Sequence, residues 1–475
     1  MSASGQQTRQ HFGAALQHHQ AGRLAQAEAL YRRVLAVQPR NAAVLNLLGI
    51  VVSQTGRHDD AANLIGSAIE VDPKLADYHH NLGNVLRDQG KFEDAAAAYR
   101  HALQIKPDYA EVHNSLGLVR KLQGKPDDAT ECFKRAVALK QDYVDAHNNM
   151  GVTLRDRGFV DEALACFERA LLLQPNQAGI HLNLGATQHM RQQLDAAIAC
   201  YERACALRPD LVDARYGLAV ALMEKGESER ALAHFEQVLR AQPDNPEVRH
   251  IMDALRHVNT ERAPVAYVRQ LFDRYAPTFD QHLVEKLNYH IPELLLQTLC
   301  DARAPAAGEL DVLDLGCGTG LFGLQARQLS RSMVGIDLSR NMLEQARRHG
   351  VYDDLVESDL IEYLANAPAA SFDLVAATDV FVYLGDLSVV FEHVHRILRS
   401  GGRFAFSVEG DNDTSGDYVL HPSGRYLHAA SYIQRLSRRL GFAEEHSGAT
   451  PIRWHDGVPA NGYIFLLRKA EAPAA

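Results

Sequence analysis

The sequence predicts a helical solenoid in the first half of the chain and an α/β domain with a doubly wound sheet in the second. Three observations support this prediction. Small and aromatic residues recur with a 34-residue step as far as about residue 245. From Glu309 onward, apolar strand-like runs alternate with helical stretches. A glycine-rich turn, residues 314–320, follows the first of those runs.

The length and composition are those of a globular protein with more than one core. The chain has 475 residues, of which 46% are hydrophobic and 23% are charged, and a single core rarely serves so long a chain. No apolar run reaches the roughly 18 residues that cross a bilayer, and the first residues lack the pattern of a secretory signal. We therefore expect a cytoplasmic protein without a membrane partner.

The six cysteines form neither a zinc motif nor a disulfide framework. No Cys-x-x-Cys pair is present, and Cys132, Cys166 and Cys200 share one repeat position. Equivalent positions of neighbouring two-helix units lie farther apart than the about 7 Å that a disulfide spans. We expect these cysteines to be buried helix residues, and we expect no metal site.

The repeat consists of four series of residues that share the 34-residue step. Glycine and alanine allow two helices to approach closely, an aromatic residue fills the gap between neighbouring units, and proline ends the second helix. The pattern resembles the tetratricopeptide repeat family, with seven units over residues 8–245 and a capping half-repeat over Pro246–His257. We assign residues 8–257 to this array. The glycine series comprises Gly49, Gly83, Gly117, Gly151 and Gly185.

In this family, the first helix of each unit lines a concave surface that holds a peptide or a partner protein. A row of amides at one place in successive first helices resembles the asparagine ladder of O-GlcNAc transferase repeats, which hydrogen-bonds an extended peptide. Basic residues six positions later would add a stripe for an acidic peptide side chain. The row comprises Asn81, Asn149 and Asn183, with Ser115 between them, and the stripe comprises Arg87, Lys121 and Arg155. The alternative is that these side chains are only solvated.

Histidine also recurs at one repeat position, at residues 79, 113, 147 and 181. Imidazoles in stacked repeats cannot converge on one ion. They stand where this family usually carries a larger packing residue, so we expect them to pack between helices.

The repeat phase ends after His257, and we assign residues 258–264 to a linker and residues 265–470 to a second domain. The alternation of strands and helices in this domain predicts a sheet that is covered on both faces. The runs that we expect to form strands are Leu310–Leu315, Ser332–Asp337, Leu355–Glu357, Phe372–Ala377, Gly402–Val408, Ala443–Ser447 and Tyr463–Arg468.

Acidic residues stand at the ends of the first three expected strands, beside the glycine-rich turn. Glycine in the turn permits a positive φ and the close approach of a nucleotide-like ligand. Taken alone, the turn also fits the dinucleotide spacing G-x-G-x-x-G from Gly318 onward. Asp337 is placed to accept hydrogen bonds from ribose hydroxyls and Asp359 from an adenine amino group, whereas Asp314 suits a cationic amino acid end better than a pyrophosphate.

These motifs resemble those of the class I S-adenosylmethionine-dependent methyltransferases over about residues 265–470. The resemblance implies a Rossmann-like seven-stranded sheet, and the run Gly462–Arg468 fits the antiparallel last strand that distinguishes this fold from dinucleotide dehydrogenases. It implies S-adenosyl-L-methionine as the cofactor, with Asp314–Gly320 at the methionine part, Asp337 at the ribose and Asp359 at the adenine. The implied cofactor-binding residues are Asp314, Gly316, Cys317, Gly318, Gly320, Asp337, Leu338, Ser358, Asp359 and Leu360, with Tyr275 from a helical lid over Tyr267–Pro292.

The resemblance places the acceptor side after the fourth strand, where residues face the transferred methyl. Asp379 and Tyr383 are the candidates there, and His421 in the insertion Glu409–His428 is a candidate general base near neutral pH. The alternative for His421 is an idle loop position. The Asn/Asp-Pro-Pro-Tyr tetrapeptide of amino-group methylation is absent from the sequence, which argues against adenine or glutamine N-methylation of that kind.

These features predict a methyltransferase that selects a protein or peptide with its repeat groove and modifies it with the fused domain, which raises the effective concentration of the held substrate. The alternative is a small-molecule O- or C-methyltransferase, resembling those of quinone or biotin-precursor synthesis, whose repeats dock a carrier protein or scaffold. A third hypothesis is an adaptor with a non-catalytic domain. Acidic side chains outnumber basic ones in residues 259–475, so nucleic acid is not an expected substrate. Self-association through an exposed end of the array stays open.

Overall fold

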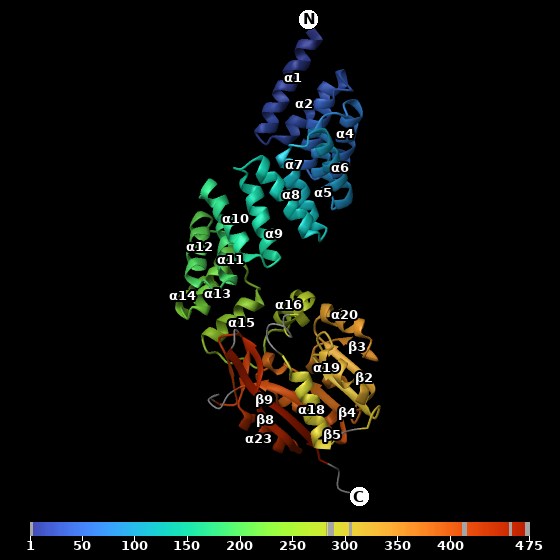
Figure 1. Ribbon diagram of the computed structural model, residues 1–475, viewed down its shortest axis with the longest axis vertical. Coiled ribbons are helices and arrows are strands. Elements are labelled where there is room, and N and C mark those ends of the chain that lie inside the picture. Colours follow the sequence, from blue (N-terminus) through green and yellow to red (C-terminus); the bar gives the residue numbers. More distant parts are fainter. Residues whose placement is uncertain are drawn as a thin grey trace. The chain divides into compact units, whose positions relative to one another are not determined.

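The computed structural model describes residues 3–281, 283, 289–303, 306–410, 416–455 and 458–470. They form two compact units, Met1–His234 and Phe235–Ala475. The described part of the first unit is helical, and the second unit contains a seven-stranded sheet (Figure 1). The predicted fold class, a repeat solenoid followed by a Rossmann-like domain, is confirmed. The expected domain limits at residues 257 and 265 stay predictions, because the division between the units falls inside helix α14 (Ser228–Ala241).

The first unit consists of antiparallel helix pairs. From α3 onward, first helices of 13 residues alternate with second helices of 14 residues. Its helices before α14 are α1 (Ala3–Gln20), α2 (Leu24–Val37), α3 (Ala42–Gln54), α4 (His58–Val71), α5 (Ala76–Asp88), α6 (Phe92–Ile105), α7 (Ala110–Leu122), α8 (Pro126–Leu139), α9 (Val144–Asp156), α10 (Val160–Leu173), α11 (Ala178–Met190), α12 (Leu194–Leu207) and α13 (Val212–Glu224).

The repeated glycines lie where the two helices of a unit cross closely. A Cβ atom at Gly83 would lie 2.5 Å from the ring of Tyr99, and one at Gly117 would lie 2.6 Å from the ring of Phe133. Both rings are fully buried. The prediction that glycine permits a close approach is therefore confirmed, although each of these aromatic rings packs against the glycine of its own unit rather than only between neighbouring units.

The repeated histidines are half-buried, and the ring centre of His79 lies 5.8 Å from that of His101 on α6. The expected packing role stays a prediction, and a hydrogen bond accompanies it. Their Nε2 atoms, in His79, His113, His147 and His181, lie 2.8–3.1 Å from the backbone carbonyl six residues earlier. A carbonyl only accepts, so Nε2 carries the proton and donates. The carbonyl lies in the turn before the helix, where no intrahelical donor reaches it. Each ring thus satisfies a turn carbonyl, and Arg215 does the same for Pro209 at 2.7 Å.

The sheet of the second unit has the strand order β3-β2-β1-β4-β5-β9-β8. Strands β1 to β5 pair in parallel, and β9 pairs antiparallel with both β5 and β8. The expected antiparallel last strand is confirmed. The strands are β1 (Leu310–Leu315), β2 (Ser330–Asp337), β3 (Asp354–Glu357), β4 (Phe372–Ala377), β5 (Leu398–Glu409), β8 (Phe442–His455) and β9 (Val458–Lys469), and a separate hairpin comprises β6 (Tyr418–Leu420) and β7 (Tyr426–His428).

Helices cover both faces of the sheet, because alternate strand residues carry apolar side chains to opposite sides. Leu313 belongs to a core with helices α21 (Leu360–Asn366), α22 (Ser388–Ile397) and α23 (Ala430–Arg439). Its neighbour Val312 belongs to the core on the other face, with α18 (Ile291–Arg303) and α19 (Leu321–Ala326). The other helices are α15 (Pro246–Leu255), α16 (Val265–Tyr275), α17 (Phe279–Gln281) and α20 (Arg340–His349). None of the helices in the described ranges has both the length and the apolarity to cross a membrane.

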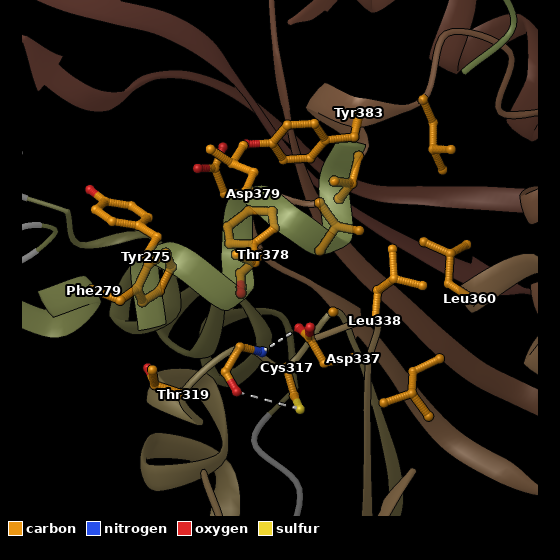
Figure 2. A pocket seen from close by; sticks show the side chains of 18 of the residues that line it. Tyr275, Phe279, Cys317, Thr319, Asp337, Leu338, Leu360, Thr378, Asp379 and Tyr383 are labelled. Atoms are coloured by element: carbon orange, nitrogen blue, oxygen red, sulfur yellow. Dashed lines mark hydrogen bonds between the residues drawn. The ribbon is translucent and has the colours of Figure 1, made fainter. Parts of the chain in front are cut away.

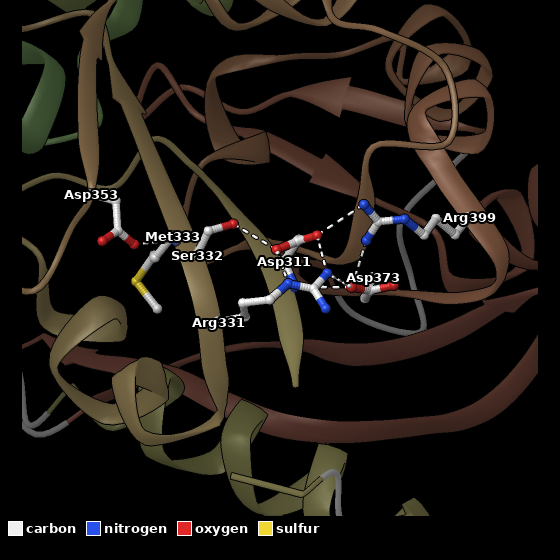
Figure 3. Close-up of polar contacts among 7 residues, drawn as sticks. All are labelled: Asp311, Arg331, Ser332, Met333, Asp353, Asp373 and Arg399. Carbon is white, nitrogen blue, oxygen red and sulfur yellow. Dashed lines mark hydrogen bonds and ion pairs between the residues drawn. The ribbon is translucent and has the colours of Figure 1, made fainter. Parts of the chain in front are cut away.

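An ion-pair network joins the amino-terminal ends of four parallel strands (Figure 3). Asp311 of β1 pairs with Arg331 of β2 and, at 2.9 Å, with Arg399 of β5, which also reaches Asp373 of β4 at 2.6 Å. The guanidinium of Arg331 is the main reason that the pKa of Asp311 lies well below its usual value. The network fixes the strand ends at this edge of the sheet and leaves the carboxyl-terminal edge for a ligand site.

Candidate active site

A cavity of about 340 Å³ lies at the carboxyl-terminal ends of β1, β2, β3 and β4. This is where open α/β sheets bind their ligands. Figure 2 shows its walls: Cys317 and Thr319 after β1, Asp337 and Leu338 after β2, Leu360 after β3 and Thr378 after β4. Most of the candidate residues predicted from the sequence line it, namely Gly316, Cys317, Gly318, Asp337, Leu338, Ser358, Asp359, Leu360, Tyr275, Asp379 and Tyr383.

The glycine turn has the backbone that the sequence predicts. Gly316 and Gly318 adopt positive φ angles of 64° and 55°, and a Cβ atom at Gly316 would lie 2.6 Å from Cγ2 of Val380. Gly320 also has a positive φ, but it is the residue before helix α19 and does not line the cavity. The first two glycines therefore bring the backbone close to any ligand in the cavity.

Two carboxyl groups lie on either side of this turn, the half-buried Asp337 and the fully buried Asp314. Asp337 accepts hydrogen bonds from the backbone N–H of Gly318 at 2.9 Å and of Ser339 at 2.8 Å, and burial raises its pKa to about 6. Asp314 accepts from the Tyr352 hydroxyl at 2.7 Å, and burial raises its pKa to about 7. Asp314 lies outside the cavity lining, and its Oδ1 has no hydrogen-bond partner among the described residues.

Asp359 lines the part of the cavity that follows β3. Its Oδ1 accepts from the backbone N–H of Ile361 at 3.0 Å and of Glu362 at 3.3 Å, at the start of α21, and its Oδ2 pairs with Arg262. Burial opposes the charged form, but Arg262 and the two N–H donors keep the pKa of Asp359 below its usual value. Arg262 itself lines the cavity, although the sequence assigned it to a linker.

Aromatic side chains from α16 and the turn after it cover the cavity. Tyr275 and Phe279 meet edge to face with ring centres 5.2 Å apart, and Phe272 meets Tyr383 in the same way at 5.4 Å. All four line the cavity. Residues 282 and 284–288 of the expected lid lie outside the described residues. The described part of the lid gives the cavity an apolar roof.

Two arginines that the sequence did not indicate meet Asp379 at the acceptor end. Arg425, from the turn between β6 and β7, lies 2.9 Å from Asp379, 2.7 Å from Glu409 and over the ring of Tyr383. Arg453 of β8 lies 3.3 Å from Asp379 and also pairs with Glu409. Glu409 and Arg425 both belong to the insertion Glu409–His428 that the sequence marked for the acceptor pocket, so their opposite charges could have indicated this ion pair.

Asp379 also has an unusual backbone. Its φ is +55°, which is uncommon for a residue with a Cβ atom and costs of order 1–3 kcal/mol. Its N–H donates to the hydroxyl of Ser407 at 3.0 Å. Strain of this kind persists where the surroundings hold it, and here two arginines hold the carboxylate of Asp379 while Ser407 holds its backbone N–H.

His421, the proposed base, is not brought to the cavity. It is exposed in the turn after β6, where its Nδ1 lies 2.9 Å from the hydroxyl of Ser423, and it does not line the cavity. The same turn directs Arg425, and not His421, into the cavity. The geometry therefore favours the alternative that His421 has no role in catalysis. Residues 411–415 of the insertion lie outside the described residues.

The candidate groove residues of the array have partners inside the array. The amides of Asn81, Asn149 and Asn183 donate to the asparagine side chain one position earlier in the preceding unit, at 2.9–3.0 Å. Arg87 pairs with Asp88, and Lys121 and Arg155 both pair with Asp156. Each asparagine of the row is thus tied to the preceding unit, and acidic neighbours partly offset the charge of the basic stripe.

The described residues contain no group of three or more histidine, cysteine or acidic side chains that could hold a metal ion. The chemistry available in the cavity is that of carboxylates, guanidinium groups, phenols and backbone amides.

Comparisons with known proteins match both halves. Residues 313–406 match a family model described as "Methyltransferase domain". Models described as "Tetratricopeptide repeat" or "TPR repeat" match segments between residues 18 and 255. The ubiquinone biosynthesis O-methyltransferase of Ralstonia nicotianae is 31% identical over 196 residues, which cover 36% of this chain and 81% of that relative.

The malonyl-(acyl-carrier protein) O-methyltransferase of Pectobacterium atrosepticum is 32% identical over 198 residues, which cover 41% of this chain and 72% of that relative. The chain belongs to the class I methyltransferases and carries tetratricopeptide repeats. This methyltransferase spans only 28% and 52% of the lengths of two other curated relatives. Among solved structures, that of MamA matches it with 25% identity and a TM-score of 0.32 over 34% of this chain and 94% of MamA.

Proposed function

We propose that this methyltransferase uses S-adenosyl-L-methionine and that its repeat array binds the protein or peptide that it modifies. The observation that carries the proposal is a single cavity with two chemically different ends. Asp337 and Asp359 lie at one end, and Asp379 and Tyr383 lie at the other. Carboxylates at strand ends suit ribose and adenine, and the acceptor end lies within the same roofed space.

The residues present fit a sulfonium nucleoside with an amino acid end. Asp314 lies buried beneath the turn and outside the cavity lining, so it would act on an ammonium group through the turn and not by direct contact. The positive φ of Gly316 and Gly318 removes side chains from the ligand's path. Asp359 already accepts from Arg262 and α21, so an adenine amino group would share these oxygens.

The residues at the acceptor end orient the acceptor and shield it from water. They form no covalent bond with it. When bound, S-adenosyl-L-methionine supplies an electrophilic methyl group on sulfur. Burial raises the pKa of Tyr383, so its hydroxyl stays protonated and can donate a hydrogen bond to an acceptor oxygen. Arg425 and Arg453 fix the carboxylate of Asp379 beside it. Tyr275 and Phe279 exclude water from the transfer.

A second candidate function is O-methylation of a small acid carried by a protein that the array docks. The observation that favours it is the pair of guanidinium groups, Arg425 and Arg453, at the acceptor end, which suit a carboxylate. Two relatives are named as O-methyltransferases of ubiquinone biosynthesis and of malonyl-(acyl-carrier protein). In this case the groove holds the carrier, and the small acid enters the cavity.

Calorimetric titration with S-adenosylhomocysteine tests the cofactor side. We expect Asp337→Ala to weaken binding at least about tenfold, because the carboxylate holds both the turn and the ribose end. His421→Ala is the matched control, because His421 is exposed and outside the cavity, and we expect its affinity to equal that of the unchanged chain. No binding by the unchanged chain, or tight binding of a pyridine nucleotide instead, would contradict the proposal.

Transfer of label from methyl-tritiated S-adenosyl-L-methionine into a native lysate then separates the two candidates. Radioactivity in a protein band that resists mild alkaline cleavage of thioesters supports a protein or peptide acceptor. Radioactivity that is released into the organic extract supports the carrier-bound acid.

A further inference from the structure

The segment from His250 to Ala263, which the sequence assigns to the array cap and the linker, lies against the acceptor end of the cavity. His250 of α15 is only 1% exposed. Its ring centre lies 5.4 Å from that of Tyr267 and 6.0 Å from that of Tyr426. Its Nε2 lies 2.8 Å from the carbonyl oxygen of Gly424 and donates to it, because a carbonyl only accepts.

Gly424 belongs to the tight turn that delivers Arg425 to the cavity. Its φ is +78°, its N–H donates to the carbonyl of His421 at 2.8 Å, and the N–H of His421 donates to the carbonyl of Arg425 at 2.9 Å. The carbonyl carbon of Gly424 is bonded to the backbone nitrogen of Arg425. In so short a turn, holding this carbonyl therefore also holds the backbone of Arg425. The bond from His250 therefore acts on the position of Arg425.

Arg425 depends on this support. Its guanidinium contacts Asp379, Glu409 and the ring of Tyr383, but its buried Nε has no hydrogen-bond partner among the described residues. A small shift of its backbone would lengthen both ion pairs, and a charge-assisted bond weakens steeply when its geometry is lost.

The residues that follow α15 hold the other acceptor element as well. Asn259 accepts from the N–H of Leu420 at 2.8 Å and donates to the carbonyl of Tyr418 at 3.3 Å. It is therefore hydrogen-bonded to both ends of β6, the first strand of the hairpin. The N–H of Ala263 donates to the carbonyl of Tyr383 at 2.9 Å. One continuous segment thus supports both Arg425 and Tyr383.

We propose that His250 is a positioning residue of the methyltransferase, which holds Arg425 against Asp379 and Tyr383 through the carbonyl of Gly424. This inference rests on the proposed function, because Arg425 is taken to lie beside the acceptor. His250 does not line the cavity and acts only through the turn.

The test compares the full chain with His250→Phe, which fills the space without a donor, and with His250→Gln, whose amide can still donate. His113→Phe is the matched control, because His113 also donates to a turn carbonyl, but within the array. We expect His250→Phe to slow tritium transfer into lysate acceptors by about tenfold or more. We expect its affinity for S-adenosylhomocysteine to stay within about twofold, and His250→Gln to recover most of the rate.

A double variant separates positioning from a general loss of structure. In an Arg425→Gln background, His250→Phe should cost less than about twofold more, because both changes remove the same contact. Equal rates for His250→Phe and the unchanged chain, or a full tenfold loss in the Arg425→Gln background, would overturn the inference.

The proposed function fails if the unchanged chain binds S-adenosylhomocysteine but transfers no tritiated methyl group to any acceptor. In that case, amide hydrogen exchange still tests the inference about His250. We expect the amides of residues 418–428 to exchange at least about tenfold faster in His250→Phe and near the original rate in His250→Gln. Unchanged exchange in His250→Phe would overturn the inference.

Discussion

Burial sets the protonation of the carboxyl groups around the glycine turn. Asp314 is completely buried, and its pKa is raised to about 7 by that burial, against an ordinary value near 3.9 for an exposed aspartate. Between these values the folded chain holds a proton that the unfolded chain releases. The free energy of unfolding must then fall as the pH rises from about 4 to about 7, and Asp314 gives its full stabilisation only at the acid end of that window.

We predict that Asp314→Asn flattens this pH dependence. From pH 7.5 to pH 5.5 the ligand-free chain should gain about 2 kcal/mol from Asp314, and the variant should lack that gain. Urea unfolding followed by the fluorescence of Trp454, the one tryptophan of the sequence, reports on the second unit.

The control for this prediction is Asp311→Asn. The pKa of Asp311 is lowered, so its contribution is lost only as the pH falls below the ordinary aspartate range. Between pH 7.5 and pH 5.5, the free energy of unfolding of that variant should change with pH as it does in the unchanged chain. Equal slopes for Asp314→Asn and the unchanged chain would show that Asp314 is ionised in the fold at both pH values.

At the scale of elements, each repeat unit depends on one close approach between its two helices. Gly117 on α7 faces the ring of Phe133 on α8, and the ring is fully buried, so it cannot yield to an added atom. The same contact recurs at Gly83 and Gly151. Regular spacing in the sequence therefore corresponds to one packing contact repeated along the solenoid.

We predict that Gly117→Ala destabilises the array by about 1–3 kcal/mol, because the new Cβ atom would lie 2.6 Å from a ring carbon of Phe133. Urea titration followed by far-ultraviolet circular dichroism measures the change.

The matched control is Gly66→Ala in the interior of α4, where nothing lies within 4 Å of the new atom. That change should stabilise the array by about 0.5–1 kcal/mol, because alanine is the better helix former. If Gly66→Ala lowered the free energy of unfolding as much as Gly117→Ala does, close packing would not be the cause of the destabilisation.

At the scale of the whole molecule, the segment that the sequence assigns to the array cap and the linker contacts residues of the methyltransferase site. Ala254 and Ala263 form a small buried core with Leu420 and Tyr426 of the hairpin. Arg262 pairs with Asp359 at the cofactor end. The helix α15 and the residues after it are therefore part of the fold that makes the cavity.

We predict that a fragment of residues 243–475 binds S-adenosylhomocysteine within about threefold of the full chain, whereas a fragment of residues 265–475 binds at least about tenfold more weakly. The shorter fragment leaves Asp359 without its guanidinium partner and exposes Tyr426, and an unpaired buried charge is strongly destabilising. Calorimetry and thermal melting of both fragments measure this. Equal affinity and equal melting temperature for the two fragments would show that residues 243–264 are dispensable.

The sequence by itself determined the features that depend on neighbours along the chain. The repeat step, the close-approach glycines and the order of acidic strand ends are all local patterns. A glycine that needs a positive φ, or a carboxylate at the end of a parallel strand, has its position set by the element that carries it. For this reason Gly316, Asp337 and Asp379 could be expected at the cavity before its shape was known.

Only the tertiary structure decided which charges meet at the acceptor end and which do not. Arg262, Arg425 and Arg453 come from three segments far apart in the sequence and reach two carboxylates, Asp359 and Asp379. Nothing in the local pattern fixes where a long guanidinium side chain ends, because its position depends on how distant segments pack. The same packing turns His421 to the surface and buries His250, so a helix expected to cap the array also contacts the turn that carries Arg425.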